Sequence, residues 1–163
     1  MNILVLCTGN SARSILLESI LNAKGEGRVR AWSAGSHPAG AVHPQSLRLL
    51  AAKGHDTAHL RSKSWDEFAV PDAPAIDLVI TVCGSAAAET CPIWPGAPIR
   101  VHWGVEDPAA VSATEQPAAF AESYRILEYR ADALLALQFE NLDRAALLQE
   151  LATIGERSDY GNI

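Results

Sequence analysis

The sequence of 163 residues has no run of basic residues and no long apolar segment. Its 13 Lys and Arg are outnumbered by 19 Asp and Glu, which gives a net charge of −6. This balance disfavours a nucleic acid or an anionic membrane as a partner, so any anion must bind at a focused local site. The first apolar run, Ile3–Leu6, stops at Cys7 and is too short for a signal peptide or a membrane span. We therefore expect a cytoplasmic protein.

Cysteine is also scarce. Cys7, Cys83 and Cys91 are the three thiols, an odd number in a chain that shows no export signal. Structural disulfides persist mainly in oxidising compartments, so reactive or metal-binding thiols are the better interpretation. With 163 residues, 48% of them hydrophobic, the chain is large enough to bury a core without the added stability of disulfides or a metal. We expect a single domain across residues 1–163, with a polar tail at 156–163 that frays.

Strand patterns alternate with helix patterns along the chain. Four short segments have the composition of strands, and the clearest are nearly all apolar: 3–6, 29–33, 76–82 and 98–102. Apolar residues recur at helical spacing in the segments 15–21, 44–51, 118–137 and 142–154. This alternation predicts an α/β fold with a parallel sheet. Such sheets bind ligands at the carboxyl ends of their strands, near the first strand-to-helix turn, which here spans residues 7–14.

The segment after the first predicted strand has the form Cys-x5-Arg-Ser. It reads Cys7-Thr8-Gly9-Asn10-Ser11-Ala12-Arg13-Ser14. Free backbone N–H groups at the start of the following helix favour a bound oxyanion. The same groups should stabilise a thiolate, so we expect a lowered pKa for Cys7 and a nucleophilic sulfur at neutral pH.

The other residues of this loop each have a physical use. Gly9 and Asn10 tolerate the left-handed backbone that a tight anion nest requires. Arg13 offers a planar fork that matches two oxygens of a tetrahedral oxyanion, and Ser14 can donate a hydrogen bond to the thiolate. The alternative is a buried cysteine at a strand end with an exposed helical arginine nearby, but the strand–loop–helix context favours a reactive loop. The predicted oxyanion-binding residues are Thr8, Gly9, Asn10, Ser11, Ala12 and Arg13.

A proton donor is predicted after the fourth strand. Asp107-Pro108 follows the segment 98–102, and so falls at the same edge of the sheet as Cys7. A carboxylic acid at this edge could protonate a leaving oxygen. Asp-Pro is also a common turn, and Glu106 competes for the role.

The other two thiols follow the third predicted strand. Cys83 comes directly after the segment 76–82, and Cys91 lies further along the same loop. Two thiols on a flexible loop beside a nucleophilic thiol suggest relayed disulfide exchange. They could instead be small buried residues, or zinc ligands together with His102, although their spacing matches no compact zinc motif. We therefore expect no bound metal.

Together these motifs resemble the low-molecular-weight tyrosine phosphatase superfamily, and within it the arsenate reductases, across about residues 2–155. The resemblance is carried by the loop 7–14 and by Ser33-Ala34-Gly35, Thr81-Val82-Cys83, Cys91-Pro92, His102-Trp103-Gly104 and Asp107-Pro108-Ala109. Phosphatases and reductases share the loop, whereas the cysteine pair and the last two motifs point to the reductases. The resemblance implies a flavodoxin-like fold, with a four-stranded parallel sheet in the order 2-1-3-4 and helices on both faces. We expect a monomer.

The resemblance also implies a mechanism of arsenate reduction. Cys7 would attack arsenate held by the loop and Arg13, while Asp107 assists the loss of water. Cys83 would then attack the adduct of Cys7 with arsenic, which releases arsenite and leaves a Cys7–Cys83 disulfide. Cys91 would move the disulfide to an exposed loop. Thioredoxin, or glutathione with glutaredoxin, would reduce it there.

One departure from the family pattern concerns a cation. Some thioredoxin-linked relatives bind potassium beside the loop, through an aspartate and residues that match Asn10, Glu18 and Ser33. In this sequence Trp65 stands nearest to that aspartate, with Asp66 next to it. The resemblance therefore leaves the potassium site in doubt.

Two other functions compete with arsenate reduction. A phosphatase for phosphotyrosine or small phosphate monoesters would use Cys7, Arg13 and Asp107 alike, with water releasing phosphate from the sulfur. Tyrosine phosphatases usually place an aromatic residue directly after Asp-Pro, but this chain has Ala109-Ala110, which argues against an aryl substrate. The third possibility is an oxyanion-binding or redox-sensing module. We favour the reductase, with residual phosphatase activity because phosphate and arsenate share charge and shape.

Overall fold

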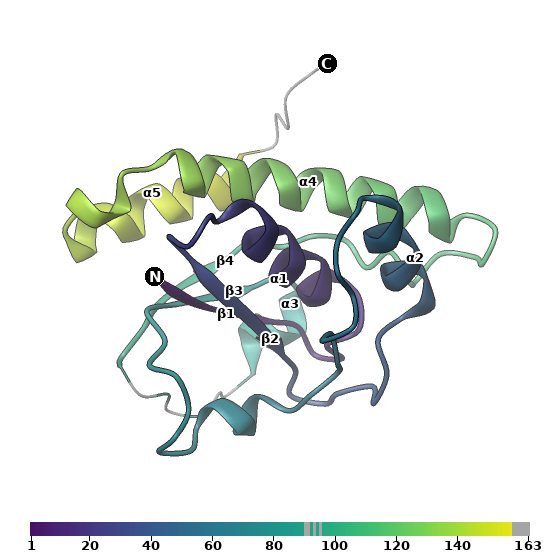
Figure 1. The fold of residues 1–163 in the computed structure, drawn as a ribbon, viewed down its shortest axis with the longest axis horizontal. Coiled ribbons are helices and arrows are strands. Elements are labelled where there is room, and N and C mark those ends of the chain that lie inside the picture. The colour runs from purple at the N-terminus through teal and green to yellow at the C-terminus, as the bar shows by residue number, and fades with distance from the viewer. Residues whose placement is uncertain (90–91, 93, 95, 158–163) are drawn as a thin grey trace.

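The computed structural model describes residues 1–89, 92, 94 and 96–157, and a four-stranded sheet lies at its centre (Figure 1). The strands are β1 (Asn2–Leu6), β2 (Arg30–Ala34), β3 (Leu78–Thr81) and β4 (Ile99–His102). Neighbouring strands are parallel, and their order is β2-β1-β3-β4. The predicted fold class and strand order are therefore confirmed.

The inner strand β1 explains why its sequence is apolar without alternation. It pairs on both sides, with Val5 opposite Ser33 of β2 and Ile80 of β3. The side chains of Ile3–Leu6 are all buried, because both faces of the sheet are covered at this strand. The parallel register also brings the carboxyl ends of the strands to one edge, so the loops that follow them meet there.

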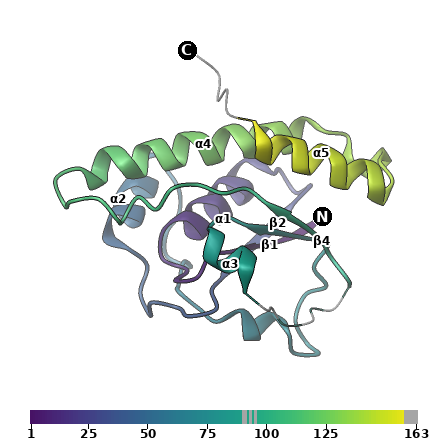
Figure 2. The same cartoon turned by 180° about the vertical axis from the view of Figure 1, so that it is seen from behind.

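Helices cover both faces of the sheet. They are α1 (Arg13–Lys24), α2 (Pro44–Ala52), α3 (Gly84–Ala88), α4 (Gln116–Ala136) and α5 (Arg144–Glu156), with short 3₁₀ turns η1 (Trp65–Phe68) and η2 (Phe139–Asn141). Helix α1 lies in front of the sheet in Figure 1, and α3 lies in front of it in the reverse view of Figure 2. Helix α4 packs on α1, and α5 packs on β4. None of the helices in the described residues is long and apolar enough to cross a lipid bilayer.

The segment after Cys83 differs from the prediction. We expected a flexible loop, but the chain enters helix α3 at Gly84, with Cys83 as its N-cap. The Cys83 sulfur accepts the Ala86 N–H at 3.4 Å. It takes the place of the side-chain oxygen of Ser, Thr, Asp or Asn that usually caps a helix. At the other end of the chain, the first residue of the predicted tail 156–163 lies in a helix. Glu156 still belongs to α5, and residues 158–163 lie outside the described part.

Candidate active site

The carboxyl edge of the sheet holds a cavity of about 470 Å³. Its walls come from three segments that are far apart in the sequence: the loop after β1, the start of α3 and the loop after β4. The lining residues are Cys7, Thr8, Gly9, Asn10, Ser11, Ala12, Arg13, Cys83, Gly84, Ser85, Asp107 and Ala109. All the residues predicted to bind an oxyanion therefore share one cavity with two of the predicted reactive thiols and the predicted acid.

The start of helix α1 supplies backbone donors to this cavity. The N-cap is Ala12, whose side chain makes no capping hydrogen bond to the first turn. First-turn N–H groups have no partner within a helix, so this end of α1 is suited to an oxyanion. Asn10 adopts the expected left-handed backbone, with φ of 45°, whereas Gly9 has no positive φ. The left-handed turn of the loop therefore depends on Asn10.

The Arg13 guanidinium contacts the loop that follows β4. Its Nη1 donates to the Val105 carbonyl oxygen at 2.9 Å, and its Nη2 lies 3.9 Å from Asp107 Oδ2. The buried Nε of Arg13 has no hydrogen-bond partner among the described residues. A planar cation fixed in this way can present its remaining donors to a tetrahedral anion.

Asp107 lies at the mouth of the cavity with its side chain 47% exposed. Its Oδ1 accepts the Ala109 N–H at 3.0 Å, so the residue forms the common Asp-Pro turn and also lines the site. Glu106 lines a neighbouring hollow beside α4 instead. The structure therefore favours Asp107 over Glu106 as the carboxylic acid of the site.

An asparagine amide holds the loop from below. Asn10 is fully buried, and its Nδ2 donates to Ser14 Oγ and to Ser33 Oγ, both at 2.9 Å. Its Oδ1 accepts the backbone N–H of Lys63 at 2.9 Å. Ser14 is also fully buried, and it is not among the residues that line the cavity. The loop conformation is therefore tied to β2 and to the segment at Lys63.

A close approach also explains one glycine of the motif Ser33-Ala34-Gly35. A Cβ at Gly35 would collide with the carbonyl oxygens of Thr8 and Cys7. The Gly35 N–H donates to the Lys63 carbonyl oxygen at 2.9 Å, which ties the two segments together. Gly35 therefore allows the strand end to pass directly under the loop.

Cys7 and Cys83 are both buried free thiols and line the same cavity. The Cys83 sulfur accepts the Thr8 N–H at 3.3 Å, in addition to the Ala86 N–H, and lies 3.5 Å from Thr8 Oγ1. Thr8 belongs to the predicted anion loop, but its contact with Cys83 spans 75 residues of sequence. The loop thus stabilises the second thiol as well as the first.

These contacts divide the charge of the pair unequally. The hydrogen bond from Cys7 lowers the pKa of Cys83 to about 5, with help from the N–H groups of Thr8 and Ala86 and against the effect of burial. The same hydrogen bond, together with burial, raises the pKa of Cys7, although the Arg13 charge opposes the shift. The prediction of a lowered pKa for Cys7 is therefore wrong for the reduced pair. The pKa of Cys83 is the lower of the two, because its sulfur accepts the N–H groups of Thr8 and Ala86.

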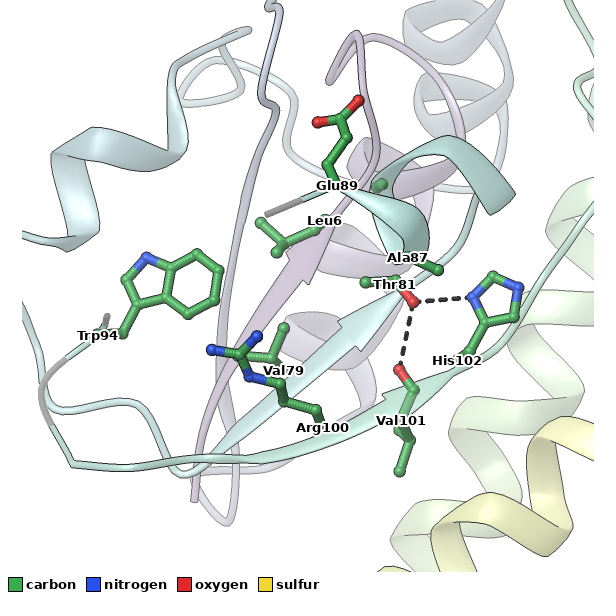
Figure 3. A pocket seen from close by; sticks show the side chains of 10 residues that line it. Leu6, Val79, Thr81, Ala87, Glu89, Trp94, Arg100, Val101 and His102 are labelled. Atoms are coloured by element: carbon green, nitrogen blue, oxygen red, sulfur yellow. Dashed lines mark hydrogen bonds between the residues drawn. The ribbon is translucent and has the colours of Figure 1, made fainter. Parts of the chain in front are cut away.

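The third predicted thiol, Cys91, lies outside the described residues. The zinc alternative would join it to Cys83 and His102, but these last two line different cavities. His102 lines a separate hollow of about 210 Å³ beneath α3, where its Nδ1 lies 2.8 Å from Thr81 Oγ1 (Figure 3). In the part of the chain that the structure describes, no group of three or more Cys, His, Asp or Glu could hold a metal ion.

The residues that resemble potassium ligands do lie together. Ser33 Oγ donates to Glu18 Oε1 at 3.0 Å, and Asn10 donates to the same hydroxyl. Lys63 also belongs to this cluster, although no motif indicated it. Its Nζ lies 3.6 Å from Glu18 Oε1. The sequence around Lys63 is polar and looks like a surface loop, so nothing in it marked this lysine as buried.

The family is decided by comparison with known proteins. The model of the family "Low molecular weight phosphotyrosine protein phosphatase" matches residues 2–148. The chain belongs to this family. An arsenate reductase from Halalkalibacterium halodurans is 36% identical over 111 residues, which cover 68% of this chain and 76% of the relative.

Solved structures of the family have the same fold. An arsenate reductase from Archaeoglobus fulgidus matches with a TM-score of 0.60 and 28% identity, over 80% of this chain and 98% of the other. A thioredoxin-dependent arsenate reductase from Corynebacterium glutamicum matches with a TM-score of 0.55 and 25% identity, over 80% of this chain and 61% of the other. The relative and these two solved structures are all arsenate reductases.

Proposed function

We propose that this chain reduces arsenate to arsenite, with Cys7 as nucleophile and Cys83 as the thiol that resolves the adduct. The observation that carries the proposal is that Cys7 and Cys83 are buried together in one cavity with Arg13 and Asp107. A phosphatase needs one nucleophilic thiol, whereas two-electron reduction needs a second thiol within reach of the first. The reductases among its relatives support the same conclusion.

The first step joins sulfur to arsenic. Arsenate binds the N–H groups of the loop and the Arg13 guanidinium, which stabilise its negative charge. Cys7 passes its proton to the Cys83 thiolate along their hydrogen bond and attacks arsenic. Asp107 protonates a hydroxyl group of the bound arsenate, which leaves as water. Ser14 donates its hydroxyl hydrogen to the Cys7 sulfur during these changes.

The second step transfers the electrons. Cys83 attacks the Cys7 sulfur, the bond between sulfur and arsenic breaks, and its electron pair stays on arsenic. Arsenic gains two electrons, while the sulfurs of Cys7 and Cys83 lose two electrons and the one proton that they share and become a Cys7–Cys83 disulfide. The proton of Cys83 goes to an arsenite oxygen. The products of the two steps are arsenite, water and the disulfide.

An external thiol reductant must close the cycle, and we propose thioredoxin. In this scheme Cys91 attacks Cys83, frees Cys7 and carries the disulfide to a surface that the reductant can reach. The thioredoxin-dependent relative from Corynebacterium glutamicum supports this choice over glutathione with glutaredoxin. Free thiols at Cys7 and Cys83 fit a reducing compartment, so we place the protein in the cytoplasm. One chain builds the whole described cavity, which supports a single domain acting as a monomer.

The cavity also supports weak phosphatase activity on small phosphate monoesters. Its lining includes Ala109 after Asp107, and no aromatic side chain is among the described lining residues. A phosphate ester could use Cys7 and Arg13 in the same way, but nothing in this lining would sandwich an aryl ring. Phosphatase activity is therefore the second function, with low activity on phosphotyrosine.

Disulfide mapping tests the proposal. Fully reduced protein is treated with arsenate in the absence of any reductant, free thiols are blocked, and disulfide-linked peptides are identified by mass. We expect one arsenite per chain and a Cys83–Cys91 disulfide, or a Cys7–Cys83 disulfide in the Cys91→Ser variant. If arsenate produced no disulfide, the reductase assignment would be wrong, and phosphate esters would become the substrates to test.

A further inference from the structure

A buried ion pair lies next to the segment that supports the oxyanion loop. The side chains of Lys63 and Glu18 are 8% and 5% exposed, and Lys63 Nζ lies 3.6 Å from Glu18 Oε1. Burying two charges is costly unless they are paired and their remaining polar atoms are hydrogen-bonded. The pair formed by Lys24 and Asp132 is a useful contrast, because both of its side chains are partly exposed.

The directions of the hydrogen bonds connect this ion pair to the loop. Asn10 Nδ2 is a donor, so the Ser33 hydroxyl accepts from it and must use its own hydrogen for Glu18 Oε1. That donation requires an acceptor oxygen on Glu18. Lys63 Nζ lies 3.6 Å from the same oxygen, so Glu18 Oε1 meets both the Ser33 hydroxyl and the ammonium. The attraction between the two charges holds the carboxylate where Ser33 can donate to it.

The same asparagine controls Ser14. One hydrogen of Asn10 Nδ2 is directed at Ser14 Oγ, which therefore keeps its own hydroxyl hydrogen for a different acceptor. The backbone N–H of Lys63 donates to Asn10 Oδ1 and so fixes which way the amide points. A change of charge at Lys63 would therefore reach the loop through Glu18, Ser33 and Asn10.

We propose that the Lys63 ammonium is a built-in cation that pairs with the Glu18 carboxylate and thereby positions the oxyanion loop. Lys63 is a positioning residue, because it does not line the cavity of Cys7. Asn10, Glu18 and Ser33 consequently do not fit a bound potassium ion in this chain, since Lys63 already neutralises their one carboxylate. The inference rests on the proposed function only in requiring that the loop binds an oxyanion.

The first test measures the affinity of reduced protein for inorganic phosphate by titration calorimetry. We expect Lys63→Met to bind phosphate about tenfold more weakly, which is typical when a supporting residue behind a site is lost. The double variant Glu18→Gln with Lys63→Met should recover most of this loss, because the glutamine oxygen can accept from Ser33 without a charge. Lys24→Met is the matched control and should bind like the parent. Equal losses in the single and double variants would overturn the proposal.

The second test replaces the missing charge from solution. A hollow of about 320 Å³, lined in part by Glu18 and Lys63, gives small ions a route to this position. In Lys63→Ala, ammonium or potassium chloride should tighten phosphate binding several-fold relative to tetramethylammonium chloride at equal ionic strength. The parent should show no such preference. An equal effect of these salts on parent and variant, or no effect on a folded variant, would contradict the proposal.

Two further outcomes keep the test decisive. If Lys63→Met does not fold, the double variant decides: phosphate binding close to the parent supports the role of the charge pair, and loss of binding refutes it. Phosphate binding does not require reduction. A parent that binds phosphate but forms no disulfide with arsenate would therefore refute the proposed function alone, whereas unchanged phosphate affinity in Lys63→Met would refute the inference alone.

Discussion

The unequal charge of the thiol pair leads to a quantitative prediction about Cys83. Its pKa should be about 5, against 9.0 for an ordinary cysteine thiol. At pH 7 these two values correspond to thiolate fractions of about 99% and about 1%. A lower pKa also weakens the sulfur as a nucleophile, and with a Brønsted slope of about 0.4–0.5 the difference costs roughly 40- to 100-fold. The two effects nearly cancel, so the pH profile of alkylation is informative whereas a single rate is not.

The profile is measured in the Cys91→Ser background, which removes the third thiol. Reduced protein is pulsed with iodoacetamide from pH 4 to 10, and the labelled Cys7 and Cys83 peptides are quantified by mass spectrometry. The alkylation rate of Cys83 should rise with a midpoint near 5 and then stay level. In Cys7→Ala this midpoint should move upward by more than one pH unit, because the largest cause of the lowered pKa of Cys83 is removed.

The reciprocal variant tests the same coupling from the other side. In Cys83→Ala, the pKa of Cys7 should fall below its value in the parent, because the hydrogen bond to Cys83 is lost while the charge of Arg13 remains. A parental Cys83 profile with a midpoint near the ordinary thiol value of 9.0 would refute the reasoning. So would a Cys83 profile that is unchanged by Cys7→Ala.

The linkage to stability has a defined sign. The pKa of Cys83 is lower in the folded protein than in the unfolded chain. Its contribution to the free energy of unfolding is therefore fully present above the ordinary thiol pKa, and it is lost as the pH falls through about 5. Chemical denaturation should therefore show that the free energy of unfolding of the parent, relative to that of Cys83→Ala, increases as the pH rises from about 5 to about 9. A difference between the two proteins that does not change with pH would argue against a thiolate at Cys83.

Three further changes have expected outcomes. Asp107→Asn should lower the rate of arsenite release in a single turnover by about 100-fold, which is at the lower end of the range for loss of a general acid. Glu106→Gln should leave this rate unchanged, because Glu106 lies outside the cavity. Equal rates in Asp107→Asn and the parent would exclude the acid role. Arg13→Lys should weaken phosphate binding by at least about tenfold in calorimetry, because a point charge cannot replace the planar fork. Gly35→Ala should lower the melting temperature by several degrees, since its Cβ collides with two backbone carbonyls of the loop; an unchanged melting temperature would show that the loop yields freely.

The local parts of the site were predictable because they depend on neighbouring residues. Cys7 and Arg13 lie at the two ends of one loop between a strand and a helix. In a parallel sheet, such a loop commonly binds an anion at the start of the helix. Asn10 adopts the left-handed conformation for which its short polar side chain is suited. Asp107 could be placed at the same edge because a strand precedes it.

The charge distribution of the site was not predictable in the same way. A lowered pKa was expected for Cys7 from its position beside a helix start, but its pKa is raised and that of Cys83 is lowered, because the Cys83 sulfur accepts N–H groups from two different segments. Lys63 was missed because a lysine in a polar segment normally indicates solvent. Only its position beneath Asn10 and beside Glu18 shows that it is buried.

The sequence by itself determined the strand–loop–helix unit with its Cys-x5-Arg-Ser motif and the parallel α/β class, since both follow from local propensity and hydrophobic pattern. The tertiary structure alone decided which groups surround the two thiols and that Lys63 lies buried beside Glu18. The physical reason is distance along the chain. Electrostatics depends on separation in space, and the contact between Thr8 and Cys83 joins residues 75 positions apart, which meet because parallel strands end at one edge of the sheet.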